Sequence, residues 1–155
     1  MTYLAYLFIV CGLVFIDQYS KSIIIAYVDL NESIPVIKNF FDITYVQNYG
    51  AGFSIMQNAT TTFYIITPIC LIIFGYLLYK TKKDEYLAKI SLLLMIGGTI
   101  GNFIDRIVRI YVIDFLDFVF FGWDFPVFNF ADMCLTVGVI LYIIVVLTEK
   151  KDAKA

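Results

Sequence analysis

Four carboxylates stand in one apolar stretch of the sequence, VIDFLDFVFFGWDFPVFNFAD, which runs from residue 112 to residue 132. They are Asp114, Asp117, Asp124 and Asp132, and no basic residue lies among them. A buried carboxylate without a partner is costly, so each group needs water, a hydrogen-bond donor or a chemical task. Two carboxylates that share one proton can serve as the base and the acid of a hydrolysis. The stretch therefore supplies candidates for such a pair.

The rest of the chain excludes several other kinds of hydrolytic site. It has no histidine, which excludes HExxH metalloproteases, Ser–His and Cys–His nucleophiles and histidine-ligated metals. Its three cysteines, Cys11, Cys70 and Cys134, are far apart within apolar runs and are expected to be packing residues. A Ser20–Lys21 pair is disfavoured, because neighbouring helical residues point to different faces. We expect no metal and no cofactor.

The residues alone select one member of the pair. Asp132 stands where a helix is predicted to start, near other polar groups. The second member is left open between Asp114 and Asp117, which are three residues apart and could lie on one face.

Composition indicates a membrane protein. Of 155 residues, 61% are hydrophobic and 15% are charged, and the mean hydropathy is +0.87. Soluble domains have about 45–50% apolar and about 25% charged residues. The net charge of −2 provides no basic surface, so nucleic acid is not an expected partner. The length predicts a single polytopic domain over residues 1–155.

Four segments are long and apolar enough to span a bilayer, which takes about 20 residues. They are approximately residues 3–26, 62–79, 86–104 and 130–147. Basic residues flank the loop between the second and third spans (Lys80, Lys82, Lys83, Lys89) and follow the fourth (Lys150, Lys151, Lys154). Because lysine and arginine favour the cytoplasmic side, both termini are predicted to be cytoplasmic.

The two outward connections are predicted to be structured. Residues 35–50, PVIKNFFDITYVQNYG, alternate apolar and polar side chains with many β-branched and aromatic ones, which predicts short strands. Residues 107–128 are too apolar for a solvated linker and are expected to lie along the membrane surface, with Tyr111 and Trp123 at headgroup level. The predicted fold is an all-α membrane bundle of four helices with a small extracytoplasmic β-rich segment and an interfacial segment.

Polar residues of three spans reach a similar depth. At about 1.5 Å per residue, Asp17 and Lys21 lie roughly 20–27 Å along the first span, and Asn102 and Arg106 lie at a similar height on the third. Asp132 opens the fourth span on the same side. Each helical pair has i,i+4 spacing and so projects from one face. Charges within a membrane usually face the bundle interior, so a shared polar site near the outer leaflet is predicted. The glycines of GGTIGN before Asn102 indicate close helix packing.

Five motifs in this order resemble the lipoprotein signal peptidases (signal peptidase II), small four-span aspartyl peptidases of the bacterial plasma membrane. The motifs are DQYSK (17–21), NYGAGF (48–53), GNFIDR (101–106), VIDF (112–115) and FNFAD (128–132). The resemblance implies that Asp114 and Asp132 are the catalytic pair. It also implies supporting or substrate-binding roles for Asp17, Lys21, Asn48, Gly50, Asn102, Arg106 and Asn129.

Some residues depart from the family pattern or lie outside it. Gly52 stands where the GAAF motif usually has its second alanine, and Met133 where a serine usually follows the last aspartate. Neither departure removes a proposed catalytic group, though Met133 could alter hydrogen bonding near Asp132. Asp117 and Asp124 lie outside the motifs and are expected to be hydrated carboxylates.

The resemblance implies an endopeptidase that removes signal peptides from prolipoproteins, N-terminal to a diacylglyceryl-modified cysteine. Its expected partners are that substrate, membrane lipids and inhibitors of the globomycin type. An alternative is a transporter or channel module whose ion path uses Asp17, Lys21, Asp105 and Asp132. Such a path would need polar groups through the full depth of the membrane. The cytoplasmic halves of the four spans look apolar instead. A non-catalytic assembly subunit would leave the clustered motifs unexplained.

Overall fold

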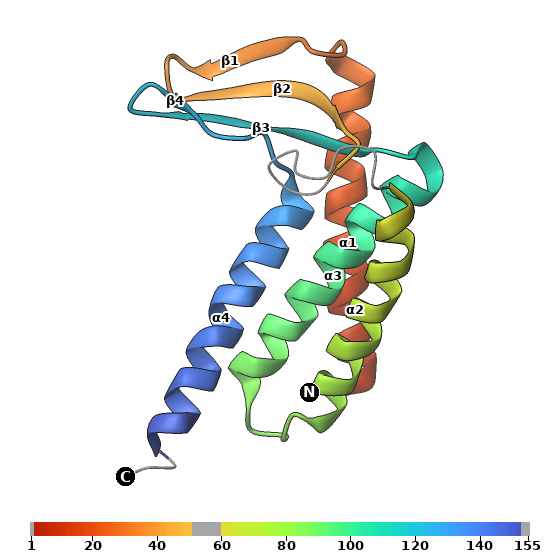
Figure 1. The fold of residues 1–155 in the computed structure, drawn as a ribbon, viewed down its shortest axis with the longest axis vertical. Coiled ribbons are helices and arrows are strands. Elements are labelled where there is room, and N and C mark those ends of the chain that lie inside the picture. The colour runs from red at the N-terminus through yellow and green to blue at the C-terminus, as the bar shows by residue number, and fades with distance from the viewer. Residues whose placement is uncertain (1, 51–59, 153–155) are drawn as a thin grey trace.

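The computed structural model describes residues 2–50 and 60–152. Its helices are α1 (Tyr3–Tyr27), α2 (Thr60–Lys80), α3 (Tyr86–Arg109) and α4 (Phe130–Asp152), and its strands are β1 (Ser33–Ile37), β2 (Phe41–Asn48), β3 (Val112–Phe120) and β4 (Trp123–Asp124). The helices run side by side, and the strands form a sheet across one end of the bundle (Figure 1).

Within the described residues, four helical segments are long and apolar enough to cross a membrane, as the sequence predicted. They are Tyr3–Tyr27, Thr62–Lys80, Tyr86–Arg109 and Phe130–Thr148. The third span was predicted too short, because the charged residues after position 104 resemble a helix end. In the structure α3 continues to Arg109, since the carboxylate of Asp105 is neutralised inside the bundle rather than exposed at its end.

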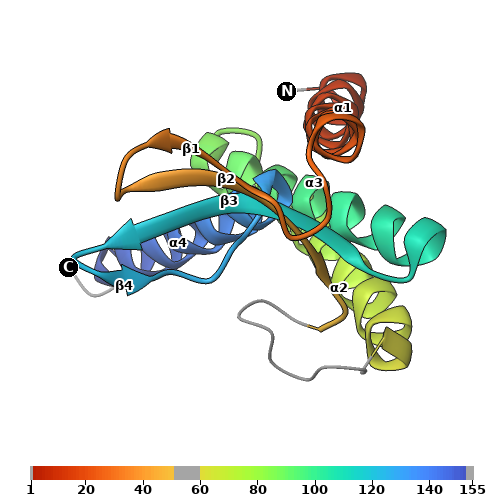
Figure 2. The ribbon, with the colours of Figure 1, turned by 90° about the horizontal axis from the view of Figure 1, so that it is seen from above.

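The strands form one antiparallel sheet in the order β1-β2-β3-β4. Viewed from above, this sheet lies across one end of the helices, with its free end over α4 (Figure 2). The sequence predicted residues 107–128 as an interfacial segment without assigning strands to it. In the structure this region contributes β3 and β4 to the same sheet as β1 and β2. Apolar residues occupy both faces of Val112–Phe120, so the period of two typical of strands is hidden there.

The strand geometry also decides between two of the candidate carboxylates. Successive side chains of a strand point to opposite faces, so residues three apart cannot share one. Asp114 and Asp117 therefore lie on opposite faces of β3, and the suggestion that they could lie together was wrong. Asp117 accepts a hydrogen bond from the Thr44 hydroxyl at 2.6 Å, whereas Asp114 is buried, with 2% of its surface exposed.

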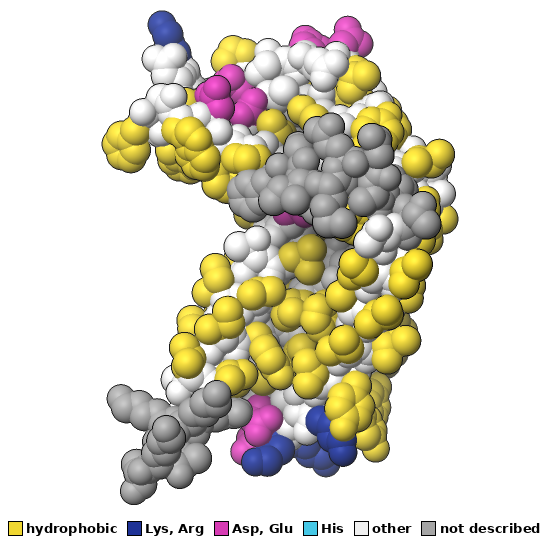
Figure 3. Space-filling model, in the orientation of Figure 1, with side chains coloured by type: hydrophobic (Ala, Val, Ile, Leu, Met, Phe, Trp, Pro, Cys, Tyr) yellow, Lys and Arg dark blue, Asp and Glu magenta, His cyan; other side chains and the backbone are white. Residues whose placement is uncertain are grey.

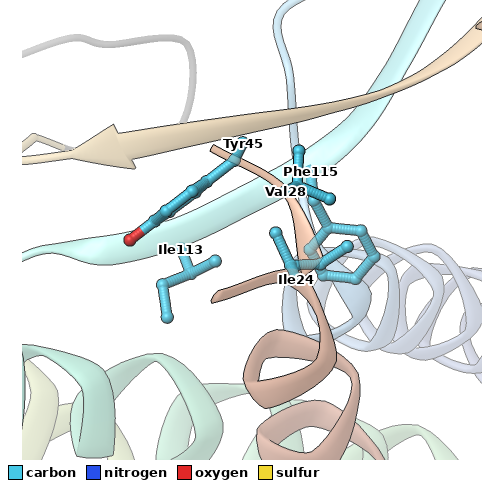
Figure 4. Packing of buried hydrophobic residues seen from close by; sticks show 5 residues of the cluster. All are labelled: Ile24, Val28, Tyr45, Ile113 and Phe115. Atoms are coloured by element: carbon cyan, nitrogen blue, oxygen red, sulfur yellow. The ribbon is translucent and has the colours of Figure 1, made fainter. Parts of the chain in front are cut away.

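An apolar cluster fixes the sheet to the bundle. Ile24 and Val28, at the end of α1, pack against Tyr45 of β2 and against Ile113 and Phe115 of β3 (Figure 4). The cluster holds the start of β3, and therefore Asp114, at a fixed position above the helices.

Glycines allow α3 to approach its neighbours closely. A methyl group at Gly97 would lie 2.8 Å from Leu13 Cδ1 of α1, and one at Gly101 would lie 2.5 Å from Asp17 Oδ2. At Gly98 it would collide with the main-chain oxygen of Ala131 in α4. The prediction that GGTIGN serves helix packing is confirmed.

Candidate active site

The start of α4 is closed by a reciprocal capping box. The side-chain oxygen of Asn129 accepts a hydrogen bond from the main-chain N–H of Asp132 at 3.0 Å. In return, Asp132 Oδ2 accepts one from the main-chain N–H of Asn129 at 3.1 Å. Such boxes satisfy N–H groups that a helix start otherwise leaves free. The box also fixes the orientation of the Asp132 carboxylate.

Asp114 reaches the same point from the sheet. Its two oxygens accept hydrogen bonds from two asparagine side chains: Oδ1 from Asn129 Nδ2 at 2.6 Å and Oδ2 from Asn48 Nδ2 at 2.8 Å. Asn48 ends β2 and pairs with Val112 of β3, so the sheet register places it beside Asp114. Asn129 therefore contacts both carboxylates.

Asn102 of α3 completes the bridge between the two carboxylates. Its Nδ2 donates to Asp132 Oδ1 at 2.8 Å, and its Oδ1 accepts from Asn129 Nδ2 at 3.1 Å. Asp114 and Asp132 are thus brought together by two asparagines, one from α3 and one from the start of α4.

Burial favours the protonated form of Asp114. Desolvation, followed by the nearby charge of Asp132, raises the pKa of Asp114 from 3.8 to about 7, and the hydrogen bonds from Asn48 and Asn129 offset part of that effect. A carboxyl group with such a pKa holds its proton over part of the neutral range. The two carboxylates can therefore carry one proton between them, as acid–base hydrolysis requires.

A buried charge cluster lies behind this pair. The Lys21 ammonium contacts Asp17 Oδ2 and Asp105 Oδ2, each at 2.9 Å, and all three side chains are at most 1% exposed. Asp105 also pairs with Arg109 at 2.8 Å. Asp17 Oδ1 accepts from the main-chain N–H of Ala131 at 3.1 Å. The cluster therefore ties α1 to α3 and to the first turn of α4.

Arg106 supports the site from another side. Its guanidinium donates to the main-chain oxygen of Gly50 at 3.1 Å and to that of Asn102 at 3.3 Å, and it lies over the ring of Phe63 at 4.4 Å. The Gly50 N–H in turn donates to Asn48 Oδ1 at 2.9 Å. Arg106 thus links α3 and α2 to the backbone that follows Asn48.

An apolar groove of about 530 Å³ opens beside the two carboxylates. Asp114 and Asp132 line it, together with Phe125–Phe128 and residues of the first two turns of α4, including Met133 and Val137. The space-filling view shows a hollow between the sheet and α4 (Figure 3). The site can therefore hold an apolar chain with a polar bond beside the two carboxylates.

The structure brings together all nine predicted site residues. Two further residues belong to the cluster. Asp105 was placed among the polar residues of the third span and in the alternative ion path, but not among the site residues. Gln18 donates to Asp17 Oδ2 and to Asp105 Oδ1, at 3.0 and 3.1 Å. Both residues lie within motifs of the family resemblance, GNFIDR and DQYSK, which could have identified them. Asp124 is exposed, Gly52 lies outside the described residues, and within them no group of three His, Cys, Asp or Glu residues could hold a metal ion.

The fold and site define a polytopic membrane protein that holds a buried and a partly buried carboxylate, linked by asparagines, beside an apolar groove. Comparison with known proteins gives the family. The family model for signal peptidase (SPase) II matches residues 9–148, and the chain belongs to this family. A lipoprotein signal peptidase of Lactiplantibacillus plantarum is 42% identical over 151 residues, which are 96% of this chain and 98% of that protein.

Solved structures agree with the assignment. A bacterial membrane enzyme determined by the in meso method at 2.3 Å resolution is 38% identical, with a TM-score of 0.90 over 97% of this chain and 92% of that one. A second, at 1.9 Å resolution, is 39% identical, with a TM-score of 0.84 over 94% of each chain.

Proposed function

We propose that this signal peptidase acts as an aspartic endopeptidase, in which Asp114 and Asp132 cleave the signal peptide of a prolipoprotein before its diacylglyceryl-modified cysteine. Membership of the signal peptidase II family supports the cleavage of lipoprotein signal peptides. The observation that carries the catalytic assignment is the joint hydrogen bonding of both carboxylates by Asn129.

The chemistry needs one proton on the pair. The ionised carboxylate removes a proton from a water molecule, whose oxygen attacks the scissile carbonyl carbon. The protonated carboxylate gives its proton to the carbonyl oxygen or, as the C–N bond breaks, to the leaving amine. The raised pKa of Asp114 lets this carboxyl hold the shared proton over part of the neutral range. No metal or cofactor takes part in this mechanism.

The groove and its rim suit a lipidated peptide. Its apolar walls, with Met133 and Val137 on α4, would take an apolar segment of the substrate, while the two carboxylates that line it meet the peptide bond. Asn48, Gly50 and Arg106, which are linked by hydrogen bonds beside Asp114, would orient the backbone of the substrate. Met133 in place of the usual serine makes this wall more apolar and leaves Asp132 with its asparagine donors.

The site would face the outer leaflet of the bacterial plasma membrane, with both termini in the cytoplasm. Four lysines around the loop between α2 and α3 support this orientation. Reporters fused after Lys83 and at the C-terminus should read cytoplasmic, and one near Glu32 should read external. The opposite pattern would put the carboxylates on the wrong side for exported lipoproteins.

A transporter or channel is not favoured. The cytoplasmic half of α3 does bury Lys89 and Ser91, so the expectation of purely apolar halves was wrong there. However, Asn102 lies roughly 20 Å further along the helix, and buried Leu92, Leu93 and Met95 stand between them. Within the described residues no polar path therefore follows α3 through the membrane.

The deciding experiment uses the purified protein with a diacylglyceryl-modified prolipoprotein and mass analysis of the products. A single cut directly before the lipidated cysteine, insensitive to EDTA and blocked by globomycin, is the expected result. Cleavage lost in EDTA and restored by zinc would rule out the aspartic mechanism.

A further inference from the structure

The two faces of the sheet differ in chemistry towards its free end. Cross-strand partners share a face, and so do residues two apart on one strand. Phe41 pairs with Phe118, and Phe120 pairs with Trp123, so these four rings form one face, which we call the aromatic face. The opposite face carries three carboxylates in the same way, through the pairs Asp42–Asp117 and Val119–Asp124.

Towards the free end of the sheet, the aromatic face is the one that looks towards α4, whereas the opposite face packs on α1 only at the start of β3, through Ile113 and Phe115. Asp114, Phe118 and Phe120 alternate on the same side of β3, and Asp114 is hydrogen-bonded to Asn129 at the start of α4. Figure 3 agrees, with hydrophobic side chains beneath the free end of the sheet and acidic ones above. Because α4 leads into the membrane, this face looks towards the outer end of the bilayer, and the acidic face looks towards water.

The hairpin tip, Phe120–Trp123, extends this aromatic surface beyond the sheet. Phe121 is fully exposed, at 109%, and Trp123 is 59% exposed. Rings at these positions bury little surface within the protein, whereas phenylalanine and tryptophan are well suited to the boundary between headgroups and acyl chains.

The backbone of the tip makes the choice of phenylalanine unusual. The two central residues of the turn, Phe121 and Gly122, both have positive φ, 52° and 81°. Hairpin turns of this kind strongly prefer asparagine or glycine at the first position, and a bulky residue there is strained. Of the other left-handed positions outside glycine in the described residues, Asn31 and Asn39 carry asparagine, and Ile110 is the residue that ends α3. A strained, fully exposed ring gains nothing inside the protein, so its benefit must come from an external apolar contact.

We infer that the hairpin tip is a lipid anchor, which inserts Phe121 and Trp123 into the outer leaflet and holds the free end of the sheet over the groove at a fixed height. The continuity of the aromatic face with the membrane-spanning end of α4 selects a bilayer over a second protein. The inference requires only that the four helices span the membrane, so it stands or falls independently of the proposed peptidase chemistry.

The native fluorescence of the protein provides the test, because Trp123 is the only tryptophan. The full chain is placed in nanodiscs whose lipids are brominated either high on the acyl chain or near its end. Strong quenching by the shallow bromines, weaker quenching by the deep ones and little quenching by aqueous iodide are expected. Efficient iodide quenching without bromolipid quenching would place the tip in water and overturn the inference.

Phe121→Asn separates the anchor from a structural role. Asparagine suits the left-handed turn, so the melting temperature in detergent should be unchanged or higher, while most bromolipid quenching of Trp123 is lost. Phe121→Leu, still apolar, should keep the quenching. Asp124→Asn, in the same hairpin but on the acidic face, should alter neither measurement. A lower melting temperature in Phe121→Asn, or quenching equal to that of the wild type, would overturn the inference.

Discussion

Lys21 donates a hydrogen bond to the side-chain oxygen of Asn102, with 2.9 Å between Nζ and Oδ1. An ammonium group can only donate, so it fixes which end of the amide faces it. The other end, Nδ2, is then directed at Asp132 Oδ1, 2.8 Å away. Lys21 thus makes no hydrogen bond to Asp114 or Asp132, yet it orients the Asn102 amide that donates to Asp132.

Removal of Lys21 should therefore cost both stability and activity. Lys21→Met leaves the carboxylates of Asp17 and Asp105 buried without their common cation. Breaking a buried ion pair in this way costs about 3–5 kcal/mol, so the melting temperature in detergent should fall sharply. Arg109→Met is the matched control, because Arg109 contacts the same Asp105 but is 22% exposed. Its cost should be at most about 1 kcal/mol, and equal losses in the two variants would contradict this account of the cluster.

The sequence predicted the helices well and the sheet less well, for a physical reason. A spanning helix such as α2 must be apolar along its length, and this leaves a signal of about 20 residues. Strand β3 has apolar residues on both faces. One face packs on α1 through Ile113 and Phe115, and the other carries the rings of Phe118 and Phe120. Its period of two was therefore hidden, and no strand was predicted from the sequence for this segment.

The site was predicted at the level of residues but not of contacts. Spacing along α1 placed Asp17 and Lys21 on one face, and in the structure the two form an ion pair, which was not predicted from the sequence. The choice of Asp114 over Asp117 came from family resemblance, since only the strand assignment puts the two on opposite faces. The capping box of Asn129 and Asp132 could have been read from their spacing, whereas the contacts between α1 and α4 depend on tertiary packing.

Asn129 has two tasks that one substitution can separate. Asn129→Ser keeps an oxygen able to cap α4 but loses the donor to Asp114 Oδ1. The change in unfolding free energy should stay within about 1 kcal/mol, while kcat should fall roughly a hundredfold, as for other oriented donors. Asn129→Ala loses the cap as well, so it should show the same loss of kcat with a lower melting temperature. Normal kcat in Asn129→Ser would remove Asn129 from the catalytic proposal.

The stability of the protein should depend on the ionisation of Asp114. Its folded-state pKa is raised from 3.8 to about 7, so the folded state holds this proton more tightly than the unfolded chain. The contribution of Asp114 to the free energy of unfolding is therefore fully present below about pH 4. It falls as the pH rises and is lost above about pH 7. Asp114→Asn should abolish this part of the pH dependence. Melting temperatures of both proteins across this range measure the difference, and parallel curves would show that Asp114 titrates normally.

The assignment of the two carboxylates is tested most directly by their asparagine variants. Asp114→Asn and Asp132→Asn nearly preserve shape but cannot exchange the proton that the mechanism needs. Each should remove almost all cleavage, and the double variant should be little worse than either single one, because groups that act as a unit are not additive.

Stability should separate this loss from misfolding. Each of the two carboxylates accepts hydrogen bonds on both oxygens, so an amide keeps one of these bonds and loses the other, at a cost of about 1 kcal/mol. Relief of the repulsion between the two carboxylates offsets part of that cost. Asp117→Asn and Asp124→Asn, on the opposite face of the sheet, should stay active. Full cleavage by Asp132→Asn, or an inactive Asp117→Asn beside an active Asp114→Asn, would show that the pair is wrongly assigned.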